Sequence, residues 1–365
     1  MSTALTGPAA DLGSNMRAGV LAAFAEANAR GGVHGRKLEL TVLDDGYEPD
    51  RAAPNMRTLV EDPSVLGIIG NVGTPTAIAA IPIANESRTL FFGAFTGAGV
   101  LRRVPPDRYV INFRASYAEE TAAMVDALVT TAGLRPGEIG FFTQRDGYGD
   151  SGFRGGIEAL KRHGLESEHG VAHGRYERNT LAVEGALAEI LRTDPPPRAV
   201  IMVGAYAPCA RFIELADEYG LDARFLNVSF VGSASLAREL GARGDGVVIT
   251  QVVPHPEADY PLVRAYRAAA VHGDLPATFG ALEGYAAART LILALRQATP
   301  PLGREQVVDA LEALGSFDVG IGRQLHLSAQ DHQASHRVWP TVIRGGEVVP
   351  MEWEELAPAF ARDRP

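Results

Sequence analysis

The positions of apolar and polar residues along the chain change period repeatedly, which predicts an order of strands and helices. Leu66–Ile69 is a short apolar run of the kind found in strands buried on both faces. Gly70–Gly73 interrupts the run with turn residues, and Ile78, Ile81 and Ile83 then begin a helical pattern. This central stretch therefore predicts a strand, a glycine turn and the start of a helix.

The helix after this turn is expected to have Thr74 as its N-cap and Pro75 in its first turn. A helix start presents unpaired backbone N–H groups and the positive end of the helix dipole, which suits an anion such as a carboxylate. The same residues also fit an ordinary connection between a strand and a helix. This stretch alone therefore does not establish a ligand site, and other parts of the sequence must be considered.

The alternation of strands and helices continues along the chain and predicts parallel sheets with helices on both faces. The predicted strands are 37–44, 66–69, 89–92, 109–113, 139–143, 167–172, 199–203, 225–228, 246–250, 324–327 and 338–344. The predicted helices besides the one after Thr74 are 16–30, 52–61, 117–132, 150–163, 180–192, 208–219, 236–240, 261–272, 279–297 and 304–313. Residues 11–14 are expected to form a loop, and 349–365 form either a packed helix or a loose tail. The order gives two successive doubly wound units.

Composition limits the classes of protein that fit this order. A chain of 365 residues suggests about two domains. The net charge of -10 argues against a partner made of nucleic acid or an anionic membrane surface. Cys209 is the single cysteine, which excludes an intrachain disulfide and a cysteine-based zinc site. No apolar run reaches the ~20 residues of a membrane span.

The first residues, Met1–Leu5, have the pattern of the end of a strand. They lack the charged and apolar regions of a signal peptide. We hypothesise that residues upstream, including a signal peptide, belong to a longer form of the chain. An in-frame stop codon close upstream of Met1 would contradict this hypothesis.

Gly147–Gly152 matches the G-x-G-x-x-G pattern of dinucleotide-binding turns, which keeps an NAD-dependent enzyme as an alternative. In that turn the strand leads directly into the first glycine, whereas three residues, 144–146, intervene here. The other explanation is a loop that projects Tyr148 from the end of a strand. Tyr206 follows the predicted strand 199–203 in the same way. Two tyrosines at the carboxyl ends of strands favour a small, partly apolar ligand, because ligands of open α/β sheets bind there.

A search for catalytic and metal-binding motifs is negative. The sequence has no nucleophile elbow, no zinc-protease helix and no phosphate-binding loop of the Walker type, and its nine histidines have no metal-ligand spacing except for the pair His332 and His336 in a polar stretch. Asp44–Asp45 ends a predicted strand, and the pair fits either a bound cation or, more simply, carboxylates that cap a turn. Glu119 and Glu120 fall in the first turn of a predicted helix, where they complement its dipole. We therefore expect no enzymatic chemistry, no metal and no cofactor.

Taken together, the segments of the chain resemble the leucine/isoleucine/valine-type substrate-binding proteins of bacterial ABC importers. The resemblance rests on residues 5–13, 27–36 with the following strand and Asp44–Asp45, 69–74, 95–97, 146–149 and 246–248. It implies the type I periplasmic-binding fold, which is α/β with two doubly wound parallel-sheet lobes and a three-stranded hinge. The lobes are expected at 1–114 with 250–327 and at 115–249 with 328–365, with a ligand cleft between them that closes by a population shift.

The resemblance also implies partners, a location and a set of ligand-binding residues. The ligand is expected to be a small carboxylate, the protein partner a membrane permease, the location periplasmic or lipid-anchored outside the cytoplasm, and the chain a monomer. The implied site comprises Thr74 for the ligand carboxylate, backbone groups of Phe95, Thr96 and Gly97 for the carboxylate or amine, Tyr148 and Tyr206 over the ligand, and Leu12 on its apolar side.

The sequence departs from the amino-acid binders of this family at Ser229. Those proteins usually place a carboxylate there for the ligand ammonium, and a buried ammonium without a counter-charge is costly. Phe95, Tyr117 and Phe230 are instead expected to line a pocket for an apolar or aromatic carboxylate. A branched-chain or related amino acid remains the other ligand class.

Two further possibilities stay open at the level of sequence. Asp146 or Glu283 is an alternative source of the carboxylate that Ser229 lacks. A ligand-sensing regulator in the cytoplasm, built on the same fold, is an alternative to the transport role because no signal peptide is present. No helix-turn-helix segment supports a DNA-binding regulator, and neighbouring permease and ATPase genes would favour transport.

Overall fold

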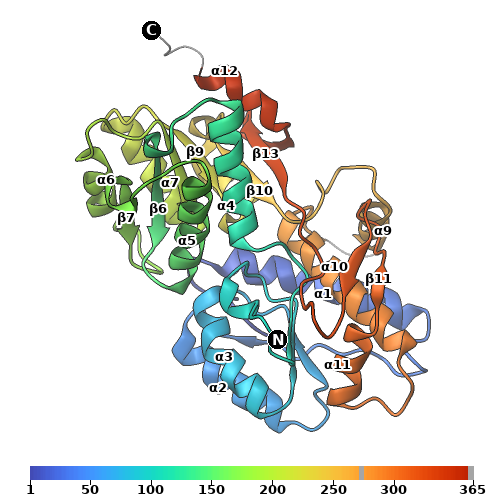
Figure 1. The fold of residues 1–365 in the computed structure, drawn as a ribbon. Helices are drawn as coiled ribbons and strands as arrows, with labels where there is room; N and C mark the ends of the chain where they lie inside the picture. Colours follow the sequence, from blue (N-terminus) through green and yellow to red (C-terminus); the bar gives the residue numbers. More distant parts are fainter. Residues whose placement is uncertain (271–274, 361–365) are drawn as a thin grey trace. The chain divides into compact units, whose positions relative to one another are not determined.

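The computed structural model describes residues 1–270 and 275–360 and divides the chain into two compact units (Figure 1). Unit 1 contains Met1–Ala115 and Val252–Arg337, and unit 2 contains Ser116–Gln251 and the chain from Val338 onward. The chain passes from one unit to the other after Ala115, Gln251 and Arg337. Both units combine helices with parallel strands, so the predicted α/β class is confirmed.

Unit 2 is built on a seven-stranded sheet with the strand order β14-β13-β10-β9-β8-β6-β7. Its strands are β6 (Ile139–Gln144), β7 (His173–Tyr176), β8 (Ala199–Val203), β9 (Arg224–Asn227), β10 (Val248–Gln251), β13 (Trp339–Arg344) and β14 (Glu347–Pro350). The five strands β10, β9, β8, β6 and β7 run parallel, and β13 and β14 extend the sheet in antiparallel pairing. Successive parallel strands are connected by helices, as parallel pairing requires.

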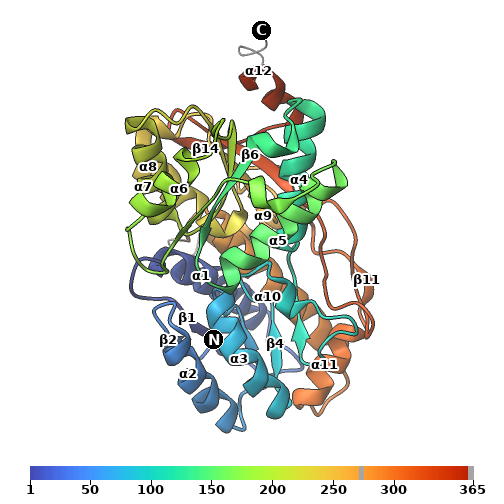
Figure 2. The ribbon, with the colours of Figure 1, turned by 60° about the vertical axis from the view of Figure 1, so that its left-hand side comes forward.

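Most helices of unit 2 flank this sheet (Figure 2). The helices of this unit are α4 (Tyr117–Asp126), which continues as a π-helix over Ala127–Thr131, α5 (Gly147–Arg162), α6 (Glu184–Leu191), α7 (Tyr206–Glu218), α8 (Ser233–Leu240) and α12 (Ala357–Phe360). Phe142 on β6 stacks on Phe212 of α7 with ring centroids 4.2 Å apart, and on Tyr176 of β7 at 5.0 Å. Such fully buried aromatic contacts fix how α7 lies on the sheet.

Unit 1 contains shorter strands. A parallel pair joins β1 (Ser2–Thr3) to β2 (Leu43–Asp44), a parallel sheet joins β3 (Gly67–Ile69), β4 (Leu90–Phe92) and β5 (Val110–Ile111), and an antiparallel pair joins β11 (Gly315–Phe317) to β12 (Leu325–Leu327). The helices are α1 (Ala10–Ala29), α2 (Pro49–Glu61), α3 (Thr74–Glu86), α9 (Pro261–Ala270), α10 (Phe279–Gln297) and α11 (Arg304–Glu312).

Helices α1 and α10 lie side by side in unit 1 (Figures 1 and 2). Their close approach depends on glycine. A Cβ atom at Gly19 would stand 1.8 Å from the carbonyl oxygen of Ala281, and one at Gly284 would stand 2.4 Å from the carbonyl oxygen of Met16. Because both distances are far below a van der Waals contact, no larger residue fits at either position without moving a helix.

Residues 328–337, expected in the second lobe, lie in unit 1 of the structure. The reason is their backbone pairing with the end of β5: the Asn112 N–H donates to the His332 carbonyl at 2.7 Å, and the Ser335 N–H donates to the Phe113 carbonyl at 2.9 Å. His332 and His336 do not form a ligand pair. His332 bonds Glu312 through Nε2 at 3.1 Å, and His336 bonds the side-chain amide of Gln333.

Several predicted boundaries near the N-terminus are wrong. The predicted loop 11–14 is part of α1, and Gly13 packs there so closely on Ala4 that a Cβ atom would stand 1.8 Å from the Ala4 carbonyl oxygen. The predicted strand 37–44 shortens to Leu43–Asp44. The side chain of Asn28 bonds the N–H and the carbonyl of Leu38 at 2.8 Å each, and residues 36–41 line a cavity of about 560 Å³. An alternating pattern predicts a strand only where a partner edge exists.

Other differences from the predicted elements arise because the pattern of apolar residues does not show which strands pair. Residues 167–172 are not a strand. A 3-10 turn at Glu168–Gly170 precedes β7, whose register places His173 opposite Phe141 and Tyr176 opposite Gln144. β11 and β14 were not predicted. The C-terminal stretch forms the end of β14, a 3-10 turn at Trp353–Leu356 and the short helix α12, with part of the predicted stretch (361–365) outside the described residues.

Within the described residues, no helix combines the length and the apolar character needed to cross a membrane. In the same residues, no group of three or more histidine, cysteine, aspartate or glutamate side chains is arranged to hold a metal ion.

His173 on β7 makes the stability of unit 2 dependent on pH. Its Nε2 bonds the Thr143 hydroxyl at 2.8 Å, and its ring stacks on Phe153. Burial, with the charge of Arg175 nearby, lowers the pKa of His173 from 6.5 to about 4. Below pH 6.5 the unfolded chain takes up a proton at this ring and the folded chain does not. The free energy of unfolding therefore falls by roughly 2–3 kcal/mol as the pH drops from 6.5 to 4.

Urea unfolding between pH 7.5 and pH 4 measures this loss. In His173→Gln, whose side chain does not titrate, that part of the pH dependence is expected to disappear. Identical pH profiles for the variant and the parent would contradict the assignment.

Candidate ligand site

The start of α3 is the first candidate site. The N-cap of this helix is Gly73, with φ of +101°, and no side chain caps it, so the prediction of Thr74 as the N-cap is wrong. Thr74 is the first helical residue. Its hydroxyl lies 2.6 Å from the hydroxyl of Thr96, and both side chains are buried. Two hydroxyls and the N–H groups of a helix start therefore gather at one point, a combination that suits a carboxylate.

The loop after β4 lies against this helix start. The Phe95 N–H donates to the Asn71 carbonyl at 2.8 Å, and the Gly73 N–H donates to the Phe95 carbonyl at 3.2 Å. These bonds place Thr96 beside Thr74, and Gly97 follows in the same buried loop. The structure thus brings together Thr74, Phe95, Thr96 and Gly97 at the carboxyl ends of β3 and β4. Leu12 lies apart from these bonds, buried in the first turn of α1.

A buried ion pair that the sequence did not reveal completes the set in unit 1. Arg114 is 0% exposed, and its Nη1 lies 3.6 Å from Oε1 of Glu283 on α10. The Arg114 guanidinium also lies over the ring of Phe95, 4.9 Å from the centroid. Glu283 was predicted as an alternative carboxylate for a ligand amine. In the structure its carboxylate lies beside the Arg114 guanidinium, with which a ligand amine would compete. Nothing in the local pattern around Arg114 distinguishes it from a surface arginine.

Three aromatic residues meet in unit 2. The ring of Tyr148 lies 5.1 Å from that of Tyr117 and 4.6 Å from that of Phe230, measured between centroids. The Tyr148 hydroxyl donates to the Gly204 carbonyl at 3.2 Å. Tyr206, two residues after Gly204, begins α7 and is 8% exposed. The predicted aromatic residues of this half of the chain thus gather at the carboxyl ends of β6, β8 and β9.

The glycine motif at 147–152 is explained by packing. It lies inside the first turns of α5 instead of in a loop before the helix. A Cβ atom at Gly149 would stand 1.9 Å from the Gln144 carbonyl oxygen, and one at Gly152 would meet Val203 at 2.6 Å. Asp146 is the N-cap of this helix and accepts from the Tyr148 N–H at 2.9 Å. It also lies 3.4 Å from Arg178, so its carboxylate already serves α5 and that arginine.

A buried carboxylate stands beside Ser229, where the sequence showed none. The Ser229 N–H and hydroxyl donate to Glu120 at 2.8 and 3.0 Å, and the Thr250 hydroxyl donates to it at 2.5 Å. Glu120 is 0% exposed. The two adjacent glutamates therefore have different roles. Glu119 forms a capping box with Ser116, whereas Glu120 reaches from α4 to the ends of β9 and β10.

The carboxylates Asp44 and Asp45 hold the turn after β2. Asp44 accepts from the Leu5 and Gly46 N–H groups at 2.9 Å each, and Asp45 accepts from the Ser2 hydroxyl at 2.7 Å. Burial raises the pKa of Asp45 to about 6. These contacts give the pair a capping role in the turn.

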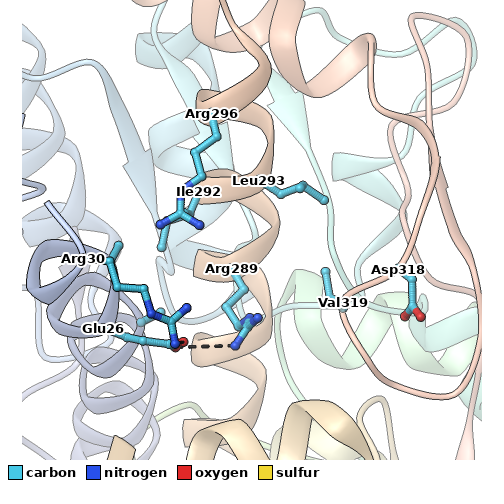
Figure 3. Close-up of a pocket in the computed structure, with 10 residues that line it drawn as sticks. Glu26, Arg30, Arg289, Ile292, Leu293, Arg296, Asp318 and Val319 are labelled. Carbon is cyan, nitrogen blue, oxygen red and sulfur yellow. Dashed lines mark hydrogen bonds and ion pairs between the residues drawn. The ribbon is translucent and has the colours of Figure 1, made fainter. Parts of the chain in front are cut away.

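A pocket of about 100 Å³ opens in unit 1 between α1 and α10 (Figure 3). Glu26 pairs there with Arg30 at 3.0 Å and with Arg289 at 3.4 Å. None of the residues expected to bind ligand lines this pocket. It is therefore distinct from both sets described above.

Two parallel-sheet units, each with polar and aromatic groups at the carboxyl ends of its strands, are typical of ligand-binding proteins of the α/β class. The profile of the periplasmic binding protein family matches residues 1–347, and the chain belongs to this family.

Individual relatives agree with this assignment. A crystal structure of a possible leucine/isoleucine/valine-binding protein from Rhodopirellula baltica is 53% identical, covers 98% of this chain and 96% of its own, and superposes with a TM-score of 0.95. The Leu/Ile/Val-binding protein of Escherichia coli K12 is 23% identical over 270 residues, which are 73% of this chain and 70% of that protein. A Thermus thermophilus structure named as a branched chain amino acid ABC transporter with bound valine is 18% identical, covers 96% of this chain and 94% of its own, and shares the fold with a TM-score of 0.81.

Substitution of Gly73 tests how much the tight turn before α3 contributes to stability. Its φ of +101° is unfavourable for other residues, and a Cβ atom there would stand 2.1 Å from the Tyr47 ring. We expect Gly73→Ala to lower the free energy of unfolding by about 2–4 kcal/mol. Gly185→Ala in α6 is the control, because no atom lies within 4 Å of a Cβ there. It should be neutral or stabilising by up to about 1 kcal/mol. Equal destabilisation of the two variants in urea would contradict this account.

Proposed function

We propose that this protein is the solute-binding component of an ABC importer and that it binds a small carboxylate. The ligand classes that fit are a branched-chain or related amino acid and an apolar or aromatic acid. The observation that carries the proposal is the pair of Thr74 and Thr96 hydroxyls, 2.6 Å apart, at the N-terminus of α3. Hydroxyl donors, unpaired helix N–H groups and the helix dipole all favour a negative charge there.

The residues of unit 2 supply the second half of the proposed site. Tyr148, Tyr206 and Phe230 offer apolar ring faces, with the Tyr117 ring next to that of Tyr148, and Ser229 offers a hydroxyl. We propose that one ligand engages both sets of residues. A ligand that contacts both units favours the conformation in which both contacts are made, so its binding shifts the population of states. The three passages of the chain between the units are the proposed hinge.

Membership of the periplasmic binding protein family supports the rest of the proposal. The protein partner would be an ABC permease in the membrane, and the location would be outside the cytoplasm, in the periplasm or on a lipid anchor. The relatives are named as binding proteins, which supports binding without catalysis and without a cofactor. An NAD titration followed by calorimetry tests the enzymatic alternative, and measurable NAD binding would favour it.

A thermal-shift screen of small carboxylates tests the proposal directly. A ligand that binds only the folded chain raises its melting temperature. The panel contains branched-chain and aromatic amino acids and the corresponding acids without the amine. If no small carboxylate of the panel raises the melting temperature at millimolar concentration, the proposal fails.

Thr74→Val provides the matching mutational test. The variant keeps the volume of the side chain and removes the hydroxyl that faces Thr96, so the affinity for the carboxylate ligand should fall about tenfold or more. Thr76→Val is the control, because the Thr76 hydroxyl donates to the carbonyl of Val72, in the turn before α3, and not to Thr96. Calorimetry should show weaker binding only for the first variant. An equal loss in both variants would mean that general disturbance of α3 is responsible.

A further inference from the structure

The cavity of about 560 Å³ in unit 1 has the surroundings that a β-strand requires. Residues 36–41 line one side of it, and residues 66–69, which contain β3, line another. In the described part of the chain β3 pairs with β4 alone, so its second edge faces no strand. We propose that this cavity is a slot for one parallel β-strand, formed by the residues that precede Met1 in a longer form of the chain. The inference does not depend on the proposed function.

β1 leads directly into this slot. On one side β1 pairs in parallel with β2, with Ser2 opposite Leu43. On its other side the Asn71 side-chain amide, just after β3, donates to the Ser2 carbonyl at 3.0 Å. β1 therefore runs between β2 and the end of β3. A strand continued backwards from Met1 would run between residues 37–41 and β3, and five residues of it would cover roughly 16 Å.

The backbone hydrogen bonds of β2 show which groups face the slot. The Leu43 N–H donates to the Met1 carbonyl at 2.9 Å. In a parallel pair every second residue of a strand bonds the same neighbour, so the N–H groups of Thr41 and Glu39 face the path of the continued strand. Among the described residues, neither of these two N–H groups has a hydrogen-bond partner. The slot thus offers two donors at the spacing of a parallel ladder.

The opposite edge of this segment is used by α1. The Asn28 side chain accepts from the Leu38 N–H and donates to the Leu38 carbonyl, at 2.8 Å each. In a regular strand, residues of even and odd number direct their backbone groups to opposite edges. Because Leu38 faces Asn28, the odd-numbered residues of the segment face the slot.

The lining of the slot determines which residues it can hold. Apolar side chains reach it from three helices: Phe24 from α1, Leu291 and Leu295 from α10, and Leu59 from α2. Ile68 of β3 also lines it. A parallel strand covered on both faces is a nearly continuous apolar run, rich in valine and isoleucine. The slot therefore selects a run of about five apolar residues directly before Met1.

Met1 already makes the hydrogen bonds of a residue inside a strand. It is 3% exposed, and its nitrogen donates to the Thr41 carbonyl at 2.8 Å. An uncharged peptide N–H makes this bond equally well. The ammonium group at this place is costly, because burial lowers the pKa of the Met1 amino group from 8.0 to about 5. A peptide bond to a preceding residue removes that cost.

Thermal unfolding of three forms of the chain tests the inference. The first begins at Met1, the second carries the residues encoded directly upstream of Met1 in its gene, after removal of any leader, and the third carries a glycine-serine segment of the same length. We expect the natural residues to raise the melting temperature by about 10 °C or more, because they bury several apolar side chains. The glycine-serine form should melt within about 2 °C of the first form.

Hydrogen exchange locates the added strand. The amide protons of Glu39 and Thr41 should exchange at least about tenfold more slowly with the natural residues than with the glycine-serine segment. In a fourth form aspartate replaces the central residue of the natural run. This form should lose most of the gain in melting temperature, because a charge would enter apolar surroundings.

Each contrary result overturns the inference. These results are an in-frame stop codon directly upstream of Met1, upstream residues without an apolar run, and a natural extension that changes neither the melting temperature nor the exchange at Glu39 and Thr41. A gain that survives the aspartate would show that the residues do not enter the slot. If protection in the form that begins at Met1 rises with protein concentration, a second copy supplies the strand. None of these measurements uses a ligand, so failure of the proposed function would leave them unchanged.

Discussion

Parallel pairing brings the carboxyl ends of neighbouring strands to one edge of a sheet, and both candidate sets of residues depend on this constraint. In unit 1 the ends of β3 and β4 carry the turn at Gly73 and the loop at Phe95, which are joined by backbone hydrogen bonds. In unit 2 the ends of β6, β8 and β9 carry Tyr148, Tyr206 and Ser229. Residues from distant parts of the sequence therefore meet without any long-range motif in the chain.

The helices fit against these sheets and each other through glycine. Gly149 and Gly152 bring α5 onto the strands of unit 2, and Gly19 and Gly284 bring α1 and α10 together in unit 1. The G-x-G-x-x-G pattern in α5 thus has a purely steric explanation. A motif that resembles a phosphate-binding turn can arise wherever a helix must approach a strand closely.

Buried charge gives the candidate sites their chemical character. Arg114 and Glu283 form one buried pair, and Glu120 is held by hydroxyl and amide donors at the strand ends of unit 2. A fully buried carboxylate is costly unless it is hydrogen-bonded, and the Ser229 and Thr250 groups provide such bonds to Glu120. Ser229 and Glu120 are separated by 109 positions in the chain, and only folding makes them a single polar group.

The sequence by itself determined the α/β class, the family and the approximate extent of most helices and inner strands. Periodicity records which side of an element is buried, so α10 and β8 were predicted at their observed boundaries. The aromatic residues and the threonine at the start of α3 were also found from their places after predicted strands. Edge strands such as β7 and β14 were misplaced or missed, because strand pairing depends on a partner edge that local pattern does not contain. Only the tertiary structure decided that Gly73 caps α3, that Arg114 stands beside Glu283, and that Ser229 donates to Glu120. Those contacts join distant segments, and their geometry is set by packing instead of by residue spacing.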